Sequence, residues 1–280
     1  MSRPPELRPP EWLLIAYFSY VALVASWSLR SAPGWISVKT WTFAVVVTAF
    51  VWICSRIGGL LRDFAPLGFT LAAYREMDWF TPAVRDHHLE RAWIVWDRWL
   101  LGQGHLRAVI ESSGALLPSY LELCYLLVYG VAPVSLALLF FNGRRDQIGR
   151  FWLAYLAGTL GAYALFPYFP SEPPRTVFPG ADLSQLPIAV RFANLWILGG
   201  YGIHSSVFPS AHVSSAFSAA WGLLATIPQR PWIGLAMALY AFSVAVATVY
   251  GRYHYGVDAV AGLAVSLLAL PGLILSRPKT

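Results

Sequence analysis

The residues Trp232–Tyr250, WIGLAMALYAFSVAVATVY, form an apolar stretch without a single charged side chain. About 20 apolar helical residues cross the hydrocarbon core of a bilayer, so this stretch predicts a transmembrane helix. The composition agrees, because 57% of the residues are hydrophobic, 12% are charged and the mean hydropathy is +0.55. The sequence therefore predicts an integral membrane protein.

Further stretches of this kind flank it on both sides and predict an all-α, polytopic membrane helix bundle of six to seven transmembrane helices. We expect residues 1–280 to form a single membrane domain, with an N-terminal helix pair over 12–61 and the main helix bundle over 119–276. The other stretches are Trp12–Leu29, Thr40–Leu61, Ser119–Phe141, Ile148–Phe169, Phe208–Ile227 and His254–Leu275.

Two connections are too long to be simple turns. Residues 62–118 are rich in Arg, Asp, His and Trp and contain RAWIVWDRWLLG, which begins at Arg91. This pattern predicts an amphipathic segment along the membrane interface, with its tryptophans at the level of the headgroups. Within that segment Asp97 is interpreted as an interfacial charge. The second long connection, 170–207, must lie in water or in a polar cavity where its backbone is irregular.

Three polar clusters interrupt the apolar stretches, and all three are predicted to lie on one side of the membrane. The first is SEPPR, Ser171–Arg175, and the second is FPSAHV, Phe208–Val213. The third is GRYHYGVD, Gly251–Asp258, which follows the stretch Trp232–Tyr250. Because each crossing reverses the side at which the chain emerges, the clusters share one face, and this predicts a functional site there.

The distribution of basic residues predicts the orientation of this face. Basic residues in short connections favour the cytoplasmic side, so the face with the clusters is expected to point away from the cytoplasm. The preference for arginine over lysine indicates a GC-rich bacterial genome, and thus a protein of the bacterial inner membrane. The basic residues on the opposite side are Arg30, Lys39, Arg144, Arg145, Arg230, Arg277 and Lys279.

In the third cluster, His254 and Asp258 are spaced four apart and so share one face if the helix has begun. A carboxylate there can keep one imidazole nitrogen protonated and leave the other with a free lone pair. The spacing therefore predicts His254 as a nucleophile or a base.

The FPSAHV cluster places polar groups at the start of a helix, where free N–H groups bind phosphate. Ser210 can add a hydroxyl donor at this end, and His212 can act as a proton donor. Arg175 and Arg252 offer planar, permanently charged groups for phosphoryl oxygens. Together these residues predict a site for a phosphate group.

Taken singly, these residues have simpler interpretations. Ser210 can merely cap its helix, and Asp258 can merely neutralise Arg252. His204 is first of all a loop residue within reach of the site, and Glu122 lies near a helix end on the side that would line a headgroup cavity. Their combination on one face makes a shared site the better interpretation.

The motifs resemble those of the type 2 phosphatidic acid phosphatase superfamily of membrane phosphatases and phosphotransferases. FPSAHV is similar to its P-S-x-H motif, and HYGVD to the H-x-x-x-D end of its next motif. The resemblance implies that His254 attacks phosphorus to form a phosphohistidine and that Asp258 orients it. It also implies that His212 is the general acid and later the base, with Ser210 and Arg175 as phosphate ligands.

The sequence departs from the superfamily pattern at two basic phosphate ligands. Tyr168 and Thr176 stand where the first motif has a lysine and a proline, and Thr248 stands where the third has an arginine. Arg252 is the expected replacement for that arginine. The altered pattern is similar to the branch containing inositol phosphorylceramide synthase, whose members move a phospho-headgroup from a glycerophospholipid to another lipid's hydroxyl.

The sequence thus favours an enzyme that cleaves a lipid phosphoester without a metal ion or cofactor, since arginines and a helix N-terminus can neutralise the phosphate charge. The sequence leaves open which molecule accepts the transferred phosphoryl group. A lipid hydroxyl would make the protein a phosphotransferase, and water would make it a lipid phosphate or polyprenyl diphosphate phosphatase. Membrane lipids are the expected partners, and no nucleic acid is expected. The alternative of another class is a membrane transporter or lipid-binding protein, which would need charges near helix centres.

Overall fold

The computed structural model describes residues 6–28, 34–84, 86–180, 182–184, 186–203 and 206–275. Helices are the regular elements of this described part, which has no strand, and the predicted all-α fold is confirmed. The α-helices are α1 (Pro9–Ser28), α2 (Gly34–Ile57), α3 (Gly59–Phe80), α4 (His88–Arg98), α5 (Leu106–Glu111), α6 (Leu116–Leu127), α7 (Val131–Phe141), α8 (Ile148–Leu165), α9 (Pro174–Val177), α10 (Ala189–Tyr201), α11 (Ala211–Thr226), α12 (Pro231–Tyr250), α13 (Gly256–Ser266) and α14 (Ala269–Leu275).

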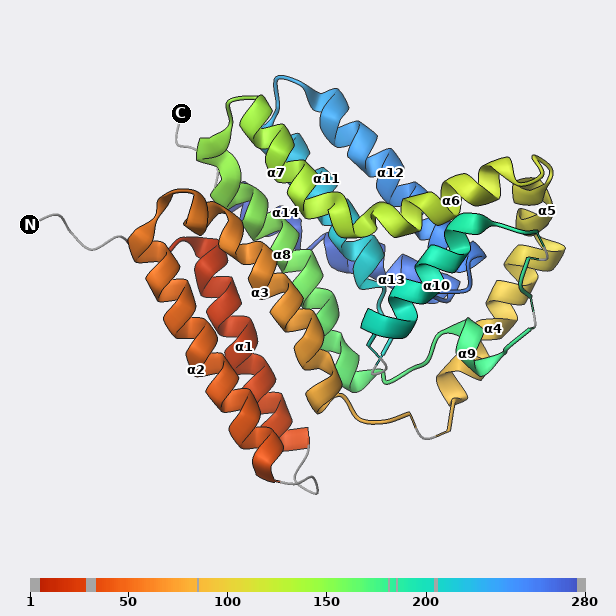
Figure 1. Ribbon diagram of the computed structural model, residues 1–280, viewed down its shortest axis with the longest axis horizontal. Helices are drawn as coiled ribbons and strands as arrows, with labels where there is room; N and C mark the ends of the chain where they lie inside the picture. Colours follow the sequence, from red (N-terminus) through yellow and green to blue (C-terminus); the bar gives the residue numbers. More distant parts are fainter. Residues whose placement is uncertain are drawn as a thin grey trace, which may run out of the picture.

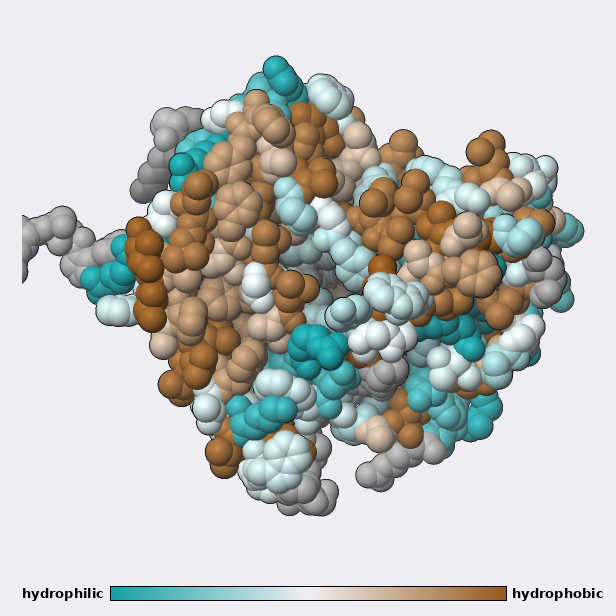
Figure 2. All heavy atoms as spheres, in the orientation of Figure 1, coloured by the Kyte–Doolittle hydropathy of each residue, from teal (hydrophilic) through white to brown (hydrophobic). Residues whose placement is uncertain are grey.

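Several helical segments are long and apolar enough to cross a membrane. Among the described residues these are Gly34–Ile57, Leu116–Phe141, Pro231–Tyr250 and Gly256–Leu275, judged by length and composition. Large apolar side chains cover much of the outer surface, including the side formed by α1, α2 and α3 (Figure 2). A surface this apolar suits contact with lipid, so the helices support a membrane protein. Six to seven crossings stay a prediction.

The N-terminal part differs from the prediction at one turn. The predicted second stretch runs to Leu61, whereas α2 ends at Ile57 and the chain turns at Gly58 and Gly59, whose φ angles of 69° and 59° favour glycine. From there α3 continues to Phe80, through the first part of the predicted interfacial segment 62–118. It packs on α1, α2 and α8, and the three N-terminal helices lie side by side (Figure 1).

The centre of the bundle is the packing of α11 against α8. A side chain on Gly158 would overlap the Ser218 hydroxyl, and one on Gly222 would approach the Phe151 ring to 2.9 Å. The Ser214 hydroxyl donates to the Gly158 carbonyl at 2.9 Å. Small residues therefore let the two helix backbones approach closely, as they do in membrane bundles.

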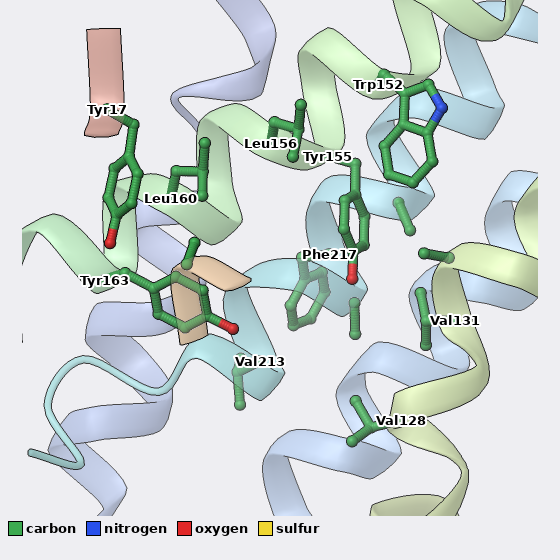
Figure 3. Packing of buried hydrophobic residues seen from close by; sticks show 14 of the residues in the cluster. Tyr17, Val128, Val131, Trp152, Tyr155, Leu156, Leu160, Tyr163, Val213 and Phe217 are labelled. Carbon is green, nitrogen blue, oxygen red and sulfur yellow. The ribbon is translucent and has the colours of Figure 1, made fainter. Parts of the chain in front are cut away.

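Larger side chains fill the space on either side of this contact. Tyr155 and Leu156 of α8 lie in the same buried cluster as Phe217 and Val213 of α11 (Figure 3). Val213 lies in the first turn of α11, beside His212. The close packing of α8 and α11 thus fixes the helix end that carries the FPSAHV cluster.

We expect Gly158→Val to lower the stability of the protein by about 1–3 kcal/mol or more, because overpacking forces two close helices apart. The measurement is thermal unfolding of the purified protein in detergent. Gly68→Ala is the matched control, since apart from neighbouring backbone of its own helix nothing lies within 4 Å of the added methyl group there. This control should keep or raise the unfolding temperature, because alanine favours helix over glycine. Equal unfolding temperatures for Gly158→Val and the unaltered protein would contradict the packing described.

Candidate active site

His254 lies in the turn between α12 and α13. Its backbone N–H donates to the Thr248 carbonyl at 3.0 Å, and its ring Nδ1 lies 2.9 Å from the Val207 carbonyl. A carbonyl oxygen can only accept, so Nδ1 carries the proton and Nε2 keeps a free lone pair. Burial, followed by the positive charge of Arg175, lowers the pKa of His254 to about 3. The ring is therefore neutral at pH 7, as a nucleophile requires.

Asp258 lies in the first turn of α13, beside His254. Its Oδ2 is 3.4 Å from His254 Nδ1 and accepts the Tyr255 backbone N–H at 2.8 Å. The Asp258 backbone N–H in turn donates to the Tyr255 carbonyl at 3.0 Å, so the two residues hold the start of α13 together. The carboxylate predicted to orient His254 is thus next to the ring, while the shorter contact of Nδ1 is with Val207.

His212 projects from the first turn of α11 toward the same point. Its ring centroid is 5.7 Å from that of His254. The His212 ring also stacks on Tyr125 of α6 at 5.1 Å between centroids, and Tyr125 stacks on Tyr253 at 3.9 Å. This stack of aromatic rings fixes the plane of His212, and its ring meets that of His254 edge-on.

Ser210 is the N-cap of α11. Its hydroxyl accepts the Val213 N–H at 3.4 Å, and its own backbone N–H donates to the Asp258 carbonyl at 2.9 Å. The hydroxyl thus caps its own helix, which was the simpler of the two interpretations. A role of Ser210 in binding phosphate stays a prediction.

A cavity of about 280 Å³ opens in front of the two histidines. Figure 2 shows that this face of the molecule is hollowed between α3 and α10. Both imidazoles and a cluster of tyrosines meet apolar side chains of α10 in its walls, so the cavity suits a ligand with a polar head and an apolar tail. Among its lining residues are Tyr74, Tyr125, Arg175, Leu198, His212 and His254.

Arg175 brings a positive charge to this cavity. It belongs to the short helix α9, and its backbone N–H donates to the Arg252 carbonyl at 3.3 Å. Its guanidinium lies over the Tyr253 ring at 5.4 Å from the ring centroid. Within the described residues no carboxylate forms an ion pair with it. Arg175 is therefore placed to meet an anionic group that enters the cavity.

Arg252 does not line this cavity. Its Nη1 donates to Asp97 Oδ2 at 2.9 Å, and both side chains are 1% exposed. The sequence interpretation that Asp258 neutralises Arg252 is therefore corrected, because Asp97 of α4 takes that place. Asp97 itself is buried, in contrast to the interfacial charge expected from its surroundings. A role of Arg252 in binding phosphate stays a prediction, against which its pairing with Asp97 and its place outside the cavity lining argue.

The remaining candidates lie around the site or outside the described part. Tyr168 is 57% exposed, and its hydroxyl accepts a hydrogen bond from Tyr20 at 3.1 Å. Glu122 is buried and accepts from the Tyr253 hydroxyl at 2.6 Å, so it supports the wall of the cavity rather than lining it. His204 lies outside the described residues.

Several residues around the cavity carry no sequence motif that would have identified them. Tyr74 reaches it from α3, and its hydroxyl accepts the Ile203 N–H at 3.1 Å. Tyr253 stands next to His254 in the sequence, and that adjacency was the available signal. Asp97 had none, because its partner Arg252 is 155 positions away.

Comparisons with known proteins identify the family of the chain. A PA-phosphatase related-family protein of Dictyostelium discoideum is 36% identical over 63 residues, which cover 22% of this chain and 11% of that protein. No solved structure matches the chain. The family description that matches residues 91–271 is the PAP2 superfamily. That range is well over half of the chain and includes all three polar clusters, so the chain belongs to the PAP2 superfamily.

Proposed function

We propose that the protein is a membrane-embedded enzyme that transfers the phosphoryl group, or a phospho-headgroup, of a phosphorylated lipid. The observation that carries this proposal is the convergence of His254, His212 and Arg175 on one cavity, with the two imidazole rings 5.7 Å apart. A neutral imidazole can attack phosphorus, and a second imidazole can exchange a proton with the leaving group. The arginine can hold the phosphoryl oxygens.

In the proposed mechanism, Nε2 of His254 attacks phosphorus while the bond from phosphorus to the leaving oxygen breaks. The leaving alcohol takes a proton from His212, which has to enter this step as imidazolium, a form that the anionic phosphate beside it favours, and a phosphohistidine remains on His254. An acceptor hydroxyl then attacks the phosphohistidine, gives its proton to the now neutral His212 and restores free His254. Asp258 orients the His254 ring through the first turn of α13. Each proton and each bond is thus accounted for within the two histidines and the substrates.

Charge on the transferring group needs to be neutralised in this scheme. Arg175 supplies a full positive charge, and the N-terminus of α11, next to His212, supplies backbone N–H groups and the positive end of the helix dipole. The scheme therefore needs no metal ion. Turnover in the presence of EDTA is the direct test of that part of the proposal.

The substrate class follows from the walls of the cavity and its place in the bundle. Leu195 and Leu198 of α10 line the cavity, while Phe192 and Trp196 of the same helix are 73% and 72% exposed. Aromatic side chains of this kind settle at the level of lipid headgroups. These features favour a lipid whose phosphate enters the cavity and whose chains stay in the membrane.

We also propose that the site faces away from the cytoplasm. Arg144, in the short connection between α7 and α8, donates to the Thr226 carbonyl at the far end of α11. Along α11, His212 and Thr226 are separated by roughly 21 Å. Short basic connections favour the cytoplasmic side, so the cavity at the opposite end points outward.

We expect His254→Ala to lower the turnover of a lipid phosphate by roughly 10³-fold or more, because it removes the nucleophile. The measurement is phosphate release and new lipid products from a panel of lipid phosphates and phospholipids, in detergent with EDTA. A phosphoenzyme that survives base and is lost in acid should be trapped in the unaltered protein and absent from the variant. His88→Ala is the control, since His88 is 68% exposed and does not line the cavity. Unchanged turnover in His254→Ala would exclude the mechanism.

The finer proposal is that a lipid hydroxyl is the acceptor, as the similarity to the inositol phosphorylceramide synthase-like branch suggests. Adding a lipid alcohol should then divert the phosphohistidine from water, so that a new phospholipid appears as phosphate release falls. The ratio of the two products, measured against the concentration of the alcohol, tests this directly. Phosphate release that stays constant with no new lipid would favour a phosphatase that uses water.

We expect Arg175→Gln to shift the acidic limb of the kcat/KM profile to higher pH. The charge of Arg175 lowers the pKa of His254, so its removal raises that pKa, and protonation then inactivates the nucleophile at a higher pH. The overall kcat/KM should fall as well, because a phosphate ligand is lost. Arg98→Gln is the control, since Arg98 pairs with Asp182 away from the cavity. An acidic limb that does not move in Arg175→Gln would contradict the electrostatic coupling.

A further inference from the structure

One face of α4 contacts all three of the polar clusters. Glu90, Ile94 and Asp97 are buried on this helix and follow one another at about one helical turn. Trp96 on its other face, and Trp99 directly after its end, are exposed. A helix with one exposed aromatic face suits the membrane interface. Its buried face, in contrast, is turned toward the loops of the site.

Asp97 holds both ends of the turn that carries His254. Its Oδ2 accepts from Arg252 at 2.9 Å, and its Oδ1 accepts the Gly256 N–H at 2.8 Å. These two donors flank His254 in the sequence. With Asp97 and Arg252 each 1% exposed, water cannot readily take the place of either partner.

The turn held in this way is strained at Arg252. Its φ of 61° is in the left-handed region, which few residues other than glycine adopt. Such a conformation persists where the surrounding structure fixes it. The Arg252 carbonyl also accepts the Arg175 N–H at 3.3 Å, so this turn helps to position the segment that carries Arg175.

Glu90 and Trp93 contact the other two clusters. Glu90 Oε1 accepts the Glu172 N–H at 2.9 Å, in the SEPPR cluster. The Trp93 ring stacks on Phe208 of FPSAHV at 5.2 Å between centroids and meets Tyr255 edge-on at 5.5 Å. The loops that carry Arg175, His212 and His254 are therefore each in contact with one helix face.

These contacts fix the positions of the site residues and add little to the free energy of unfolding. A buried ion pair is on balance no more stabilising than apolar residues of the same volume, because both charges lose their hydration. The carboxylates of α4 bind the backbone N–H groups of Glu172 and Gly256 directly, and so add side-chain contacts to the backbone hydrogen bonds of these segments. Since phosphoryl transfer depends strongly on the position of the reacting groups, this geometry should control its rate.

We propose that α4 is a positioning helix, whose Glu90, Trp93 and Asp97 fix the three loops of the site and so set the placement of His254 relative to His212 and Arg175. The inference rests on the proposed function, because it concerns the rate of phosphoryl transfer at that site. None of the three α4 residues lines the cavity, so they act through the loops and not on the substrate.

The test replaces the buried pair as a unit, with Asp97→Leu combined with Arg252→Met. Removing both charges together leaves no unpaired buried charge, so the fold should survive. We expect kcat to fall by about 10- to 100-fold, because a small displacement of the catalytic groups slows the chemical step. Orthovanadate, which mimics the five-coordinate transition state, should bind more weakly by a similar factor, while KM changes less. Trp93→Leu is the second variant and should act in the same direction.

Asp63→Leu combined with Arg145→Met is the matched control. Asp63 is 6% exposed and pairs with Arg145 at 2.8 Å, on the turn that starts α8, far from the cavity. Arg145 is half exposed, and Asp63 also pairs with Arg8 at 3.4 Å. This pair should leave kcat, KM and the inhibition by vanadate unchanged for each folded molecule. Thermal unfolding in detergent separates a loss of folded protein from a change in rate.

Unaltered kcat and vanadate inhibition in both α4 variants, with or without lower stability, would overturn the inference and leave the proposed function standing. A protein that turns over no lipid phosphate even without substitutions would overturn the proposed function, and the inference with it. Slower turnover with weakened vanadate binding in the α4 variants, and wild-type kinetics in the Asp63 control, would support the positioning role.

Discussion

The backbone N–H of Ser210 donates to the Asp258 carbonyl at 2.9 Å, and this bond joins the first turns of α11 and α13. It requires the two helices to approach closely, which Gly262 permits, because a side chain there would collide with the Ser210 carbonyl. His212 and His254 lie on either side of this junction and so face each other at 5.7 Å. This contact between helix ends thus brings both imidazoles to the wall of one cavity.

Around the junction, buried polar groups are held by specific partners, as a low-dielectric environment requires. Glu122 of α6 receives Arg191 at 2.7 Å, the Asn194 amide at 2.8 Å and the Tyr253 hydroxyl at 2.6 Å. This carboxylate thereby fixes α10 and orients the tyrosine ring over which Arg175 lies. The charge that would meet a phosphate is thus supported by Tyr253, which lines the cavity, and by a network behind it that does not.

Much of the fold could be predicted because a local run of apolar residues is enough to identify a membrane helix. The predicted stretches from Ser119 onward agree with the helices to within a few residues at most of their ends, and alternation of sides then brings the polar clusters together. The N-terminal half was harder, because α3 carries charged residues such as Asp63 and Glu76 that interrupt its apolar character. These charges are buried against other helices, and hydropathy alone cannot show that.

The sequence by itself determined that the protein lies in a membrane, where its main helices run and which two histidines belong to the site. Apolar runs and short motifs depend only on residues close together in the chain. Only the tertiary structure decided the partner of Arg252. Asp258 was the nearby candidate in the sequence, but the guanidinium lies on Asp97, 155 positions away. The physical reason is that a buried charge pairs with whichever carboxylate the packing of helices brings within hydrogen-bond reach. That choice depends on where α4 lies, which no local pattern records.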